Sequence, residues 1–505
     1  MSLRELPARP DLEHLKKQAR TLQHQRLASD AAATTRFTAF GITSAEPKLA
    51  DALHVIAREY GFDTWPALKL HVEAASEDPV EALTAAVKAN NVGLVRDVLA
   101  RHPSLRLKIN EPLPNYGFDA PAIFAAVNHQ NREMVDALLD AGANVNERTR
   151  WWAGSFGVLD SANTELAAYL ISRGAVVDIH AAARLGMIDR VRELLAEDIQ
   201  RVHARGGDGQ MPLHFASTVA IASVLLDAGA DIDARDIDHE STAVQYMVSI
   251  RPYRHEVAQY LIARGAQADI FAASAVGDIA LVERILNDDP ETVRITVNER
   301  YFPKRDPKSG GCIYIFGFGF TKLPHMIAHQ FGHQAVFELL MQRSPNWLRL
   351  LAAAEIGDEA LASRILEQHP SLFTRLSGNA ARRIIGAAVR NNARAVELLL
   401  SYGWPSDPAL DNNQTALHYA AWHGNLAMAR ALLKHNAPVN VFENEHGGSP
   451  LAWALHGSLH SWERAKGDYP GVTRALLAAG AEIPKPEGPL EASEEVLEII
   501  RQHTG

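Results

Sequence analysis

The stretch Thr415-Ala-Leu-His-Tyr-Ala-Ala-Trp-His-Gly-Asn425, followed by Leu426-Ala-Met-Ala-Arg-Ala-Leu-Leu433, decides how this chain folds. Apolar residues recur at helical spacing on both sides of the Gly-Asn dipeptide, which predicts two helices joined by a tight turn. Thr415 can cap the first helix, because its hydroxyl accepts a hydrogen bond from a free backbone N–H group. One such pair cannot bury its own apolar face, so further pairs must stack on it.

The same pattern recurs along the chain. Met211-Pro-Leu-His-Phe-Ala leads to Val224-Leu-Leu-Asp-Ala-Gly-Ala, and Leu323-Pro-His-Met-Ile-Ala-His leads to Phe337-Glu-Leu-Leu-Met. Met211 and Thr415 are 204 residues apart and span six repeat starts, so the mean period is 34. A Gly-Ala pair follows many predicted second helices, where glycine suits a left-handed cap. These pairs begin at Gly142, Gly174, Gly229, Gly265 and Gly480.

This pattern resembles the ankyrin repeat family, whose unit has about 33 residues and a Thr-Pro-Leu-His-x-Ala signature. The resemblance covers residues 79–484, and its most specific unit is Gln414–Asn440. It implies an all-α solenoid of about twelve helix-pair units. The second helices are expected to begin near Val92, Arg132, Thr164, Ile188, Val219, Arg254, Ile279, His333, Asp358, Asn392, Asn425 and Pro470.

Residues 1–75 lie outside the repeat and predict an amino-terminal helical module. The module has 10 basic and 9 acidic residues, a net charge of +1 that leaves −11 for the remainder. It resembles the amino-terminal module of many bacterial ankyrin proteins, which implies a bacterial origin. The segment from Ile56 to Lys69 is similar to a helix-turn-helix, but Trp65 to His71 offers only Lys69 and His71 to read bases. We therefore expect a helical cap, and a second capping helix within residues 485–505.

An insertion at residues 292–320 interrupts the repeat. Val293-Arg-Ile-Thr-Val-Asn-Glu-Arg alternates β-branched with polar residues, Asp306-Pro-Lys-Ser-Gly-Gly is a turn signal, and an apolar aromatic run follows Cys312. This order predicts an inserted β-hairpin. Its Tyr301 and Tyr314 are candidate partner-binding residues, because exposed aromatic side chains make good interface anchors. The alternative is a hairpin that packs on neighbouring repeats and fills a gap.

A second insertion, residues 457–471, lies in the last repeat. Aromatic and titratable residues concentrate around it: Trp453, His456, His460, Trp462, Asp468 and Tyr469. These side chains could form the pocket of an enzyme or small-molecule binder, which a deep cavity with converging polar groups would support. They could also form a rigid plug that closes the stack, and the structural interpretation is favoured.

Further candidate partner-binding residues come from the repeats themselves. Trp151 and Trp152 stand where a loop between repeats should project, unless they pack under the degenerate third unit. Trp422 and His423 end the first helix of the most specific unit. With Tyr301 and Tyr314, they make up the predicted partner surface on the concave face and loop tips.

Composition and motifs exclude several classes of function. A net charge of −10 is unfavourable for a general nucleic-acid binder, and no apolar run reaches the roughly 18 residues of a membrane span. The one cysteine, Cys312, excludes a disulfide framework and fits a reducing cytoplasm. No phosphate-binding loop or nucleophile elbow is present. We expect no nucleic-acid or membrane partner and assign no catalytic residue.

The 22 histidines do not form a metal-binding motif. His325, His329 and His333 have helical spacing, but Gly332 should end the helix before His333. His456 and His460 lack the glutamate that a His-Glu-x-x-His site requires. We expect loop histidines that form hydrogen bonds, with no metal and no cofactor. The sequence thus predicts a monomeric cytoplasmic scaffold that binds a protein partner.

Overall fold

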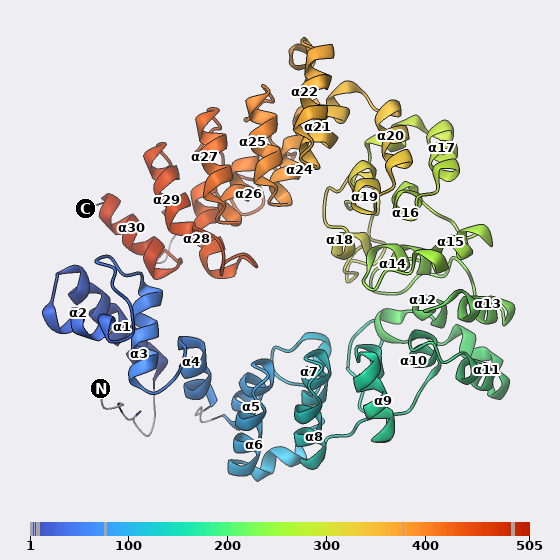
Figure 1. Ribbon diagram of the computed structural model, residues 1–505, viewed down its shortest axis with the longest axis horizontal. Coiled ribbons are helices and arrows are strands. Elements are labelled where there is room, and N and C mark those ends of the chain that lie inside the picture. Colours follow the sequence, from blue (N-terminus) through green and yellow to red (C-terminus); the bar gives the residue numbers. More distant parts are fainter. Residues whose placement is uncertain are drawn as a thin grey trace. The chain divides into compact units, whose positions relative to one another are not determined.

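The computed structural model describes Arg4, Leu6 and residues 11–74, 78–376, 378–485 and 490–504. Parts of the predicted amino-terminal module (1–3, 5, 7–10 and 75) and of the predicted carboxy-terminal cap (486–489 and 505) lie outside the described residues. The chain forms two compact units, Met1–Ala230 and Asp231–Gly505. Both units are built from helices (Figure 1).

Unit 1 begins with four helices around their own core and continues as helix pairs. Its helices are α1 (Leu12–Leu27), α2 (Ala31–Thr38), α3 (Leu49–Glu59), α4 (Trp65–Ala74), α5 (Pro79–Lys88), α6 (Val92–Arg101), α7 (Ala122–Asn128), α8 (Arg132–Asp140), α9 (Thr164–Ser172), α10 (Ile179–Arg184), α11 (Ile188–Glu197), α12 (Pro212–Phe215) and α13 (Val219–Asp227). A second hydrophobic core runs from Ala82 to Ala181 through the paired helices.

Unit 2 continues the paired arrangement to the end of the described chain. Its helices are α14 (Ala243–Ser249), α15 (His255–Ala263), α16 (Ile270–Val276), α17 (Ile279–Asp288), α18 (Tyr314–Gly317), α19 (Pro324–Gln330), α20 (Gln334–Arg343), α21 (Asn346–Glu355), α22 (Glu359–Gln368), α23 (Gly378–Ala381), α24 (Arg383–Val389), α25 (Ala393–Ser401), α26 (Ala416–Trp422), α27 (Leu426–Lys434), α28 (Pro450–His460), α29 (Tyr469–Ala478) and α30 (Glu494–Thr504). In its second half, α24, α26 and α28 pack in one row and α25, α27 and α29 in another.

A helix begins within one residue of each predicted second-helix start, from α6 at Val92 to α29 at Tyr469. Asparagine caps explain several of these starts. The side chains of Asn91, Asn131 and Asn425 accept hydrogen bonds from backbone N–H groups three residues later, at 3.0, 3.1 and 3.0 Å. The Asn425 amide also donates to Asn391 Oδ1 of the preceding pair at 2.7 Å. The caps therefore start the helices and join neighbouring pairs. The number of repeat units stays a prediction.

The predicted β-hairpin is wrong. In the described residues, β-pairing is confined to isolated bridges, such as the one between Ala409 and Thr415. The apolar run after Cys312 forms the short helix α18, and Tyr314 and Phe318 stack one helical turn apart with ring centroids 5.0 Å apart. Both side chains are buried. Within this run, Tyr314 and Phe318 fill space in the helix stack, while the ring of Phe316 remains 60% exposed.

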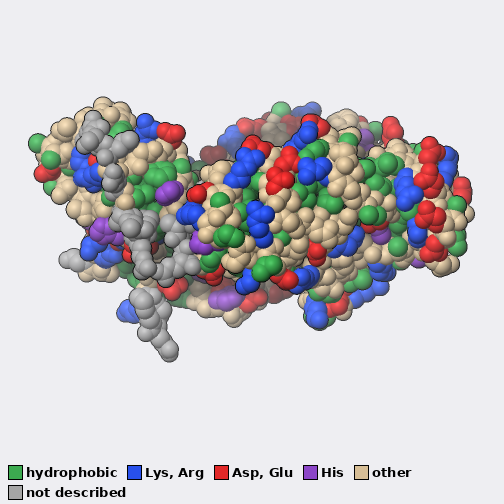
Figure 2. All heavy atoms as spheres, turned by 90° about the horizontal axis from the view of Figure 1, so that it is seen from below, with side chains coloured by type: hydrophobic (Ala, Val, Ile, Leu, Met, Phe, Trp, Pro, Cys, Tyr) green, Lys and Arg blue, Asp and Glu red, His purple; other side chains and the backbone are tan. Residues whose placement is uncertain are grey.

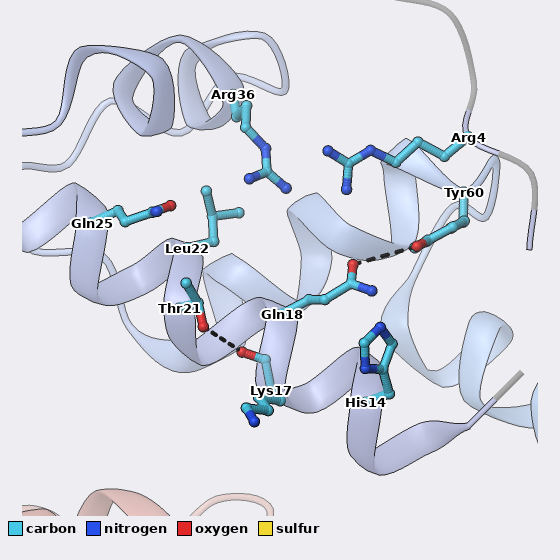
Figure 3. Close-up of a pocket in the computed structure, with 9 residues that line it drawn as sticks. All are labelled: Arg4, His14, Lys17, Gln18, Thr21, Leu22, Gln25, Arg36 and Tyr60. Carbon is cyan, nitrogen blue, oxygen red and sulfur yellow. Dashed lines mark hydrogen bonds between the residues drawn. The ribbon is translucent and has the colours of Figure 1, made fainter.

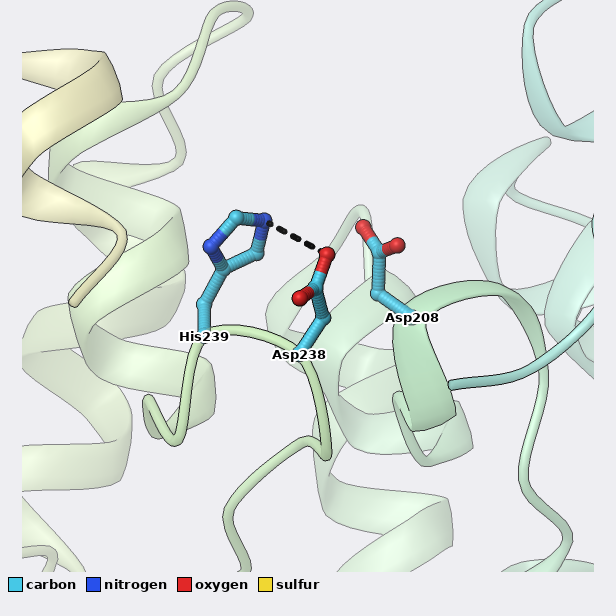
Figure 4. Close-up of side chains that lie close together, drawn as sticks. All are labelled: Asp208, Asp238 and His239. Atoms are coloured by element: carbon cyan, nitrogen blue, oxygen red, sulfur yellow. Dashed lines mark ion pairs between the residues drawn. The ribbon is translucent and has the colours of Figure 1, made fainter. Parts of the chain in front are cut away.

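A loop between repeats holds the insertion in place. The backbone N–H of Gly310 donates to Asp238 Oδ1 at 3.0 Å, and His239 Nδ1 lies 3.0 Å from Gly311 O. The backbone N–H of Ile313 donates to the hydroxyl of Ser241, also at 3.0 Å. Asp238 and His239 are neighbours on this loop, with His239 Nε2 3.8 Å from Asp238 Oδ2 (Figure 4). These bonds make the insertion part of the folded core of unit 2.

The surface shows no large area of one charge on the face drawn in Figure 2, where basic and acidic side chains are interspersed. Many charged side chains of the described residues form pairs, such as Arg96 with Glu133 at 2.7 Å. No described helix combines the length and the apolar character that a bilayer-spanning helix needs.

Candidate functional site

An aromatic surface lies on the first-helix row of unit 2, over α26 and α28. We call it the aromatic platform. It comprises Trp422, Trp453, His456, His460 and Trp462. His423 contacts Trp462 but is only 3% exposed, so the prediction that its side chain faces a partner is wrong. Helix geometry places these residues together, because Trp453, His456 and His460 follow one another at spacings of three and four residues on one face of α28. Trp422 occupies the matching face at the end of α26.

The rings of the platform are in direct contact. Trp422 lies at the centre, with its ring centroid 6.2 Å from Trp453, 5.9 Å from His456 and 5.6 Å from Trp462. The His456 and His460 rings are 4.3 Å apart. The contacts of Trp422 with Trp453 and Trp462 are edge-to-face, a geometry that stabilises aromatic pairs by about 0.5–1.5 kcal/mol beyond the burial of their area. The rings of the platform are therefore in contact before any partner binds.

Much of the platform faces solvent. Trp462 is 71% exposed, His456 and His460 are exposed, and Trp422 and Trp453 are half-buried. Burial and the nearby charge of His460 lower the pKa of His456, and burial lowers the pKa of His423. Both imidazoles are therefore harder to protonate than a free histidine side chain. An exposed group of large aromatic rings has the chemistry of a protein-binding hot spot.

Two residues of the predicted pocket have structural roles instead, one in the core and one as an exposed helix cap. Tyr469 is buried, and its hydroxyl donates to the backbone oxygen of Trp422 at 2.8 Å. Its ring lies against Gly424, Gly457 and Gly467 so closely that a Cβ atom on any of them would come within 3.0 Å of it. Asp468 caps α29 by accepting from the backbone N–H of Gly471 at 2.8 Å. Tyr469 thus fills the space behind the platform and fixes its central tryptophan.

The predicted residues of unit 1 form a smaller apolar patch. Trp152 is 40% exposed and lies 6.3 Å from the half-buried ring of Trp151. Trp151 contacts Phe118 edge-to-face at 5.1 Å, and Phe118 is itself 46% exposed. Phe118 comes from the preceding loop and has no motif around it, so its sequence context does not mark it as a site residue.

The two tyrosines of the insertion have different environments. Tyr301 is 40% exposed and lines a large cavity in unit 2. Tyr314 is fully buried, and its hydroxyl donates to Asp269 Oδ1 at 3.1 Å. The prediction that Tyr314 faces a partner is therefore wrong, since its side chain is part of the core.

The repeat histidines form hydrogen bonds. His325 Nε2 lies 2.8 Å from Ser344 Oγ, His333 Nε2 3.0 Å from Ala275 O, and His423 Nε2 3.0 Å from Val389 O. Glu443, Glu445 and His446 cluster closely enough to bind a cation. However, backbone N–H groups of Glu445, His446 and Gly448 already donate to the Glu443 carboxylate. These hydrogen bonds lower the pKa of Glu443 despite its burial. The carboxylate therefore stabilises the conformation of its own loop.

The amino-terminal helices enclose a basic hollow of about 730 Å³ (Figure 3). Behind it, the buried carboxylate of Glu59 accepts two hydrogen bonds from Arg36, at 2.6 and 2.8 Å, and pairs with Arg4 at 3.3 Å. Figure 3 shows His14, Lys17 and Gln18 along the α1 side of the hollow. The two arginines therefore hold α2 and the chain before α1 onto α3, and their charge is partly neutralised by Glu59.

Comparison with known proteins supports one family. The model described as "Ankyrin repeats (3 copies)" matches residues 350–443 and 384–483, and the model described as "Ankyrin repeat" matches residues 120–150 and 208–237. Ankyrin repeat and SAM domain-containing protein 6 of Mus musculus is 30% identical over 121 residues, 23% of this chain and 14% of the relative.

A second relative matches a longer part of the sequence. Ankyrin repeat domain-containing protein SAT10 of Stachybotrys chartarum is 22% identical over 348 residues, 62% of this chain and 17% of the relative. The chain matches between 13% and 17% of the length of these curated relatives. A solved structure of the human ASB11 ankyrin repeat domain aligns with 61% of this chain and 99% of its own, at 18% identity and a TM-score of 0.22. Together with the repeat motif and the paired helices, the family matches show that the chain is an ankyrin repeat protein.

Proposed function

We propose that the chain is a monomeric, cytoplasmic protein-interaction scaffold that binds a protein partner through the first-helix row of unit 2. The observation that carries this proposal is the aromatic platform. Ankyrin repeats generally mediate protein–protein interaction, and this chain adds an exposed group of contacting aromatic rings to such an array. The buried, free thiol of Cys312 is compatible with a reducing compartment.

Trp462 is the residue to test, because its burial in an interface should contribute a large part of the binding free energy. A tryptophan that becomes buried at the centre of an interface typically contributes at least 2 kcal/mol, or about 30-fold in affinity. Trp462 is exposed before binding and no described hydrogen bond of the fold involves its indole, so replacing it should leave the fold intact. Trp422 is less suitable for this purpose, because its backbone oxygen accepts the bond from Tyr469.

The experiment compares affinity capture by the full chain, by Trp462→Ala and by the control Phe316→Ala. Phe316 is another exposed aromatic residue, 60% exposed, but it lies on α18 away from the platform helices. We expect Trp462→Ala to lose at least one captured protein by an order of magnitude, while Phe316→Ala retains it. Identical capture profiles for all three proteins would refute the platform as the binding surface.

A second surface is available in unit 1. Trp152→Ala, made in the same background, tests the Phe118–Trp151–Trp152 patch independently. Loss of a different set of proteins in this variant would show that each unit carries its own partner surface. An enzyme or small-molecule binder at residues 453–469 is less well supported, because the ring of Tyr469 occupies the space between the helices there.

A further inference from the structure

A cavity of about 880 Å³ opens on the same helix row as the platform, one helix earlier. It lies between α21, α24 and the insertion, and helix α24 packs directly against α26. The repeat register explains the hollow. Counting back from the cap residues Asn392 and Asn425, Gly386 and Val389 of α24 occupy the positions that Tyr419 and Trp422 occupy in α26. Because α24 has no aromatic side chains at these two positions, the space that Tyr419 and Trp422 fill beside α26 stays open beside α24.

The cavity lining combines apolar and charged side chains. Its apolar residues include Trp347, Leu351 and Val389. Its charged residues are five arginines (Arg294, Arg300, Arg382, Arg383 and Arg390) and four carboxylates (Asp289, Glu291, Glu355 and Asp411). A ligand that combines a negative charge with apolar groups fits this lining where arginines lack a carboxylate partner.

Three of the five arginines have carboxylate partners. Arg294 pairs with Glu291 at 2.7 Å, Arg382 pairs with Asp411 at 2.6 Å, and Arg390 pairs with the fully buried Glu355. The remaining two, Arg300 and Arg383, have no carboxylate within ion-pair distance among the described residues. The cavity therefore contains two cationic groups that the fold does not neutralise.

The fold holds Arg383 in place without neutralising it. Its guanidinium donates to the backbone oxygen of Arg294 at 2.7 Å and to Thr296 Oγ1 at 3.3 Å. Burial lowers the pKa of Arg383, the neighbouring Tyr301 opposes this change, and the charges of Arg300 and Arg390 lower the pKa further. Thr321, the residue that follows the insertion, lies close to α24, since a Cβ at Gly386 would be 3.2 Å from Thr321 Oγ1. Residues of the insertion and of α24 thus line the same recess.

We propose that this recess binds a carboxylate side chain, Asp or Glu, of an extended acidic–apolar segment in the protein partner. Arg300 and Arg383 receive the carboxylate, and the apolar lining residues, Trp347 among them, receive a flanking apolar side chain. Guanidinium groups match carboxylates by paired, charge-assisted hydrogen bonds. A partner segment that crosses the platform reaches the recess by continuing along the same helix row. The inference rests on the proposed function and specifies the partner's chemistry.

The test uses the full chain and an array of blocked heptapeptides in which Glu, Gln, Leu and Lys are varied at every position. We expect bound peptides to share Glu at one position beside an apolar residue, and replacement of that Glu by Gln to weaken binding at least tenfold. Arg300→Glu should abolish the preference for Glu and favour Lys at the same position. Such a switch requires contact with the peptide and would not follow from a structural role.

Matched variants complete the design. Arg284→Glu makes the same charge reversal at an exposed site on α17 and should leave the preference unchanged. Arg383→Gln should weaken the Glu-containing peptides while a thermal melt confirms folding. Absence of a preference for Glu, or a preference that survives Arg300→Glu, would overturn the proposal. So would Arg300-dependent binding of inorganic phosphate or succinate without any peptide selectivity, which would indicate a small-anion site. If partner capture still depends on Trp462 in those cases, the proposed function stands and only the inference about acidic segments fails.

Discussion

Tyr314→Phe tests whether the insertion is part of the core of unit 2. The Tyr314 hydroxyl is one of four hydrogen-bond donors to the Asp269 carboxylate. The other donors are the backbone N–H groups of Phe271 and Ala272, each at 2.9 Å, and Gln245 Nε2 at 3.2 Å. Burial raises the pKa of Asp269, so the loss of any donor is felt in a poorly solvated site. The same carboxylate caps α16, which links the insertion to a repeat helix.

The magnitude follows from what the substitution removes. Phenylalanine keeps the ring contacts with Phe302 at 5.5 Å and Phe318 at 5.0 Å, and loses only the hydroxyl. A hydrogen bond to a charged group contributes about 1.5–3 kcal/mol, so we expect the free energy of unfolding to fall by that amount. Tyr314→Ala also leaves a cavity and should lower it by about 3–5 kcal/mol.

Urea denaturation followed by circular dichroism measures both changes. The control is Tyr402→Phe, since Tyr402 is only partly buried and its hydroxyl has no described hydrogen bond. Limited proteolysis of residues 298–312 provides a second measurement, because a detached insertion would be cleaved quickly. A Tyr314→Phe variant within 0.5 kcal/mol of the parent chain, together with a Tyr314→Ala variant that loses less than about 1 kcal/mol, would refute the placement of this side chain in the core.

Two further expectations concern buried titratable groups. Burial lowers the pKa of His325 to about 4, below its unfolded value near 6.5, so between these pH values only the unfolded state binds the proton. The free energy of unfolding should therefore fall by about 3 kcal/mol between pH 6.5 and pH 4. A His325→Gln variant should lack this component of the pH dependence in urea denaturation. A pH dependence equal in both proteins would show that His325 is accessible. Burial also raises the pKa of the Cys312 thiol to about 11, so only about one thousandth is thiolate at pH 8, and Ellman's reagent should react slowly with the native chain but fast in denaturant. Fast labelling of the native chain would contradict this burial.

Local patterns in the sequence predicted the helices well. The Gly-Asn turn before Leu426 and the equivalent turns elsewhere are local signals, since each depends on backbone conformation and capping within a few residues. Helices consequently begin within one residue of the predicted positions. The most specific unit, Gln414–Asn440, also predicted that helix pairs stack on one another, because neighbouring units of a repeat array have similar structures.

The insertion shows where local patterns fail. Alternation of β-branched and polar residues after Val293 predicted a strand, but such alternation only shows that side chains point to two sides. The side chains of Tyr314 and Phe318 are buried in the helix stack, where α18 packs against α14 and Tyr314 contacts Phe271 of α16. The sequence does not predict this burial, because it depends on where α14 and α16 lie in space. Tertiary burial thus overrode a weak local preference.

The candidate site required both kinds of information. The sequence identified Trp422, Trp453, His456 and Trp462 as unusual, but divided them between a partner surface and a possible pocket. Their ring contacts unite them on one surface, while the buried hydroxyl of Tyr469 removes that residue from it. The unpaired Arg300 and Arg383 belong to different segments and carry no motif, so only the folded chain brings them to one cavity.

By itself, the sequence determined the repeat family and the helix pairs, because these depend on spacing and on interactions within a few residues. The tertiary structure decided the role of each unusual residue: Tyr314 in the core, Tyr469 behind the platform, and Trp462 in solvent. The physical reason is that burial and charge pairing depend on residues far away in the chain. A side chain becomes a core residue or a binding residue according to which distant neighbours remove it from water.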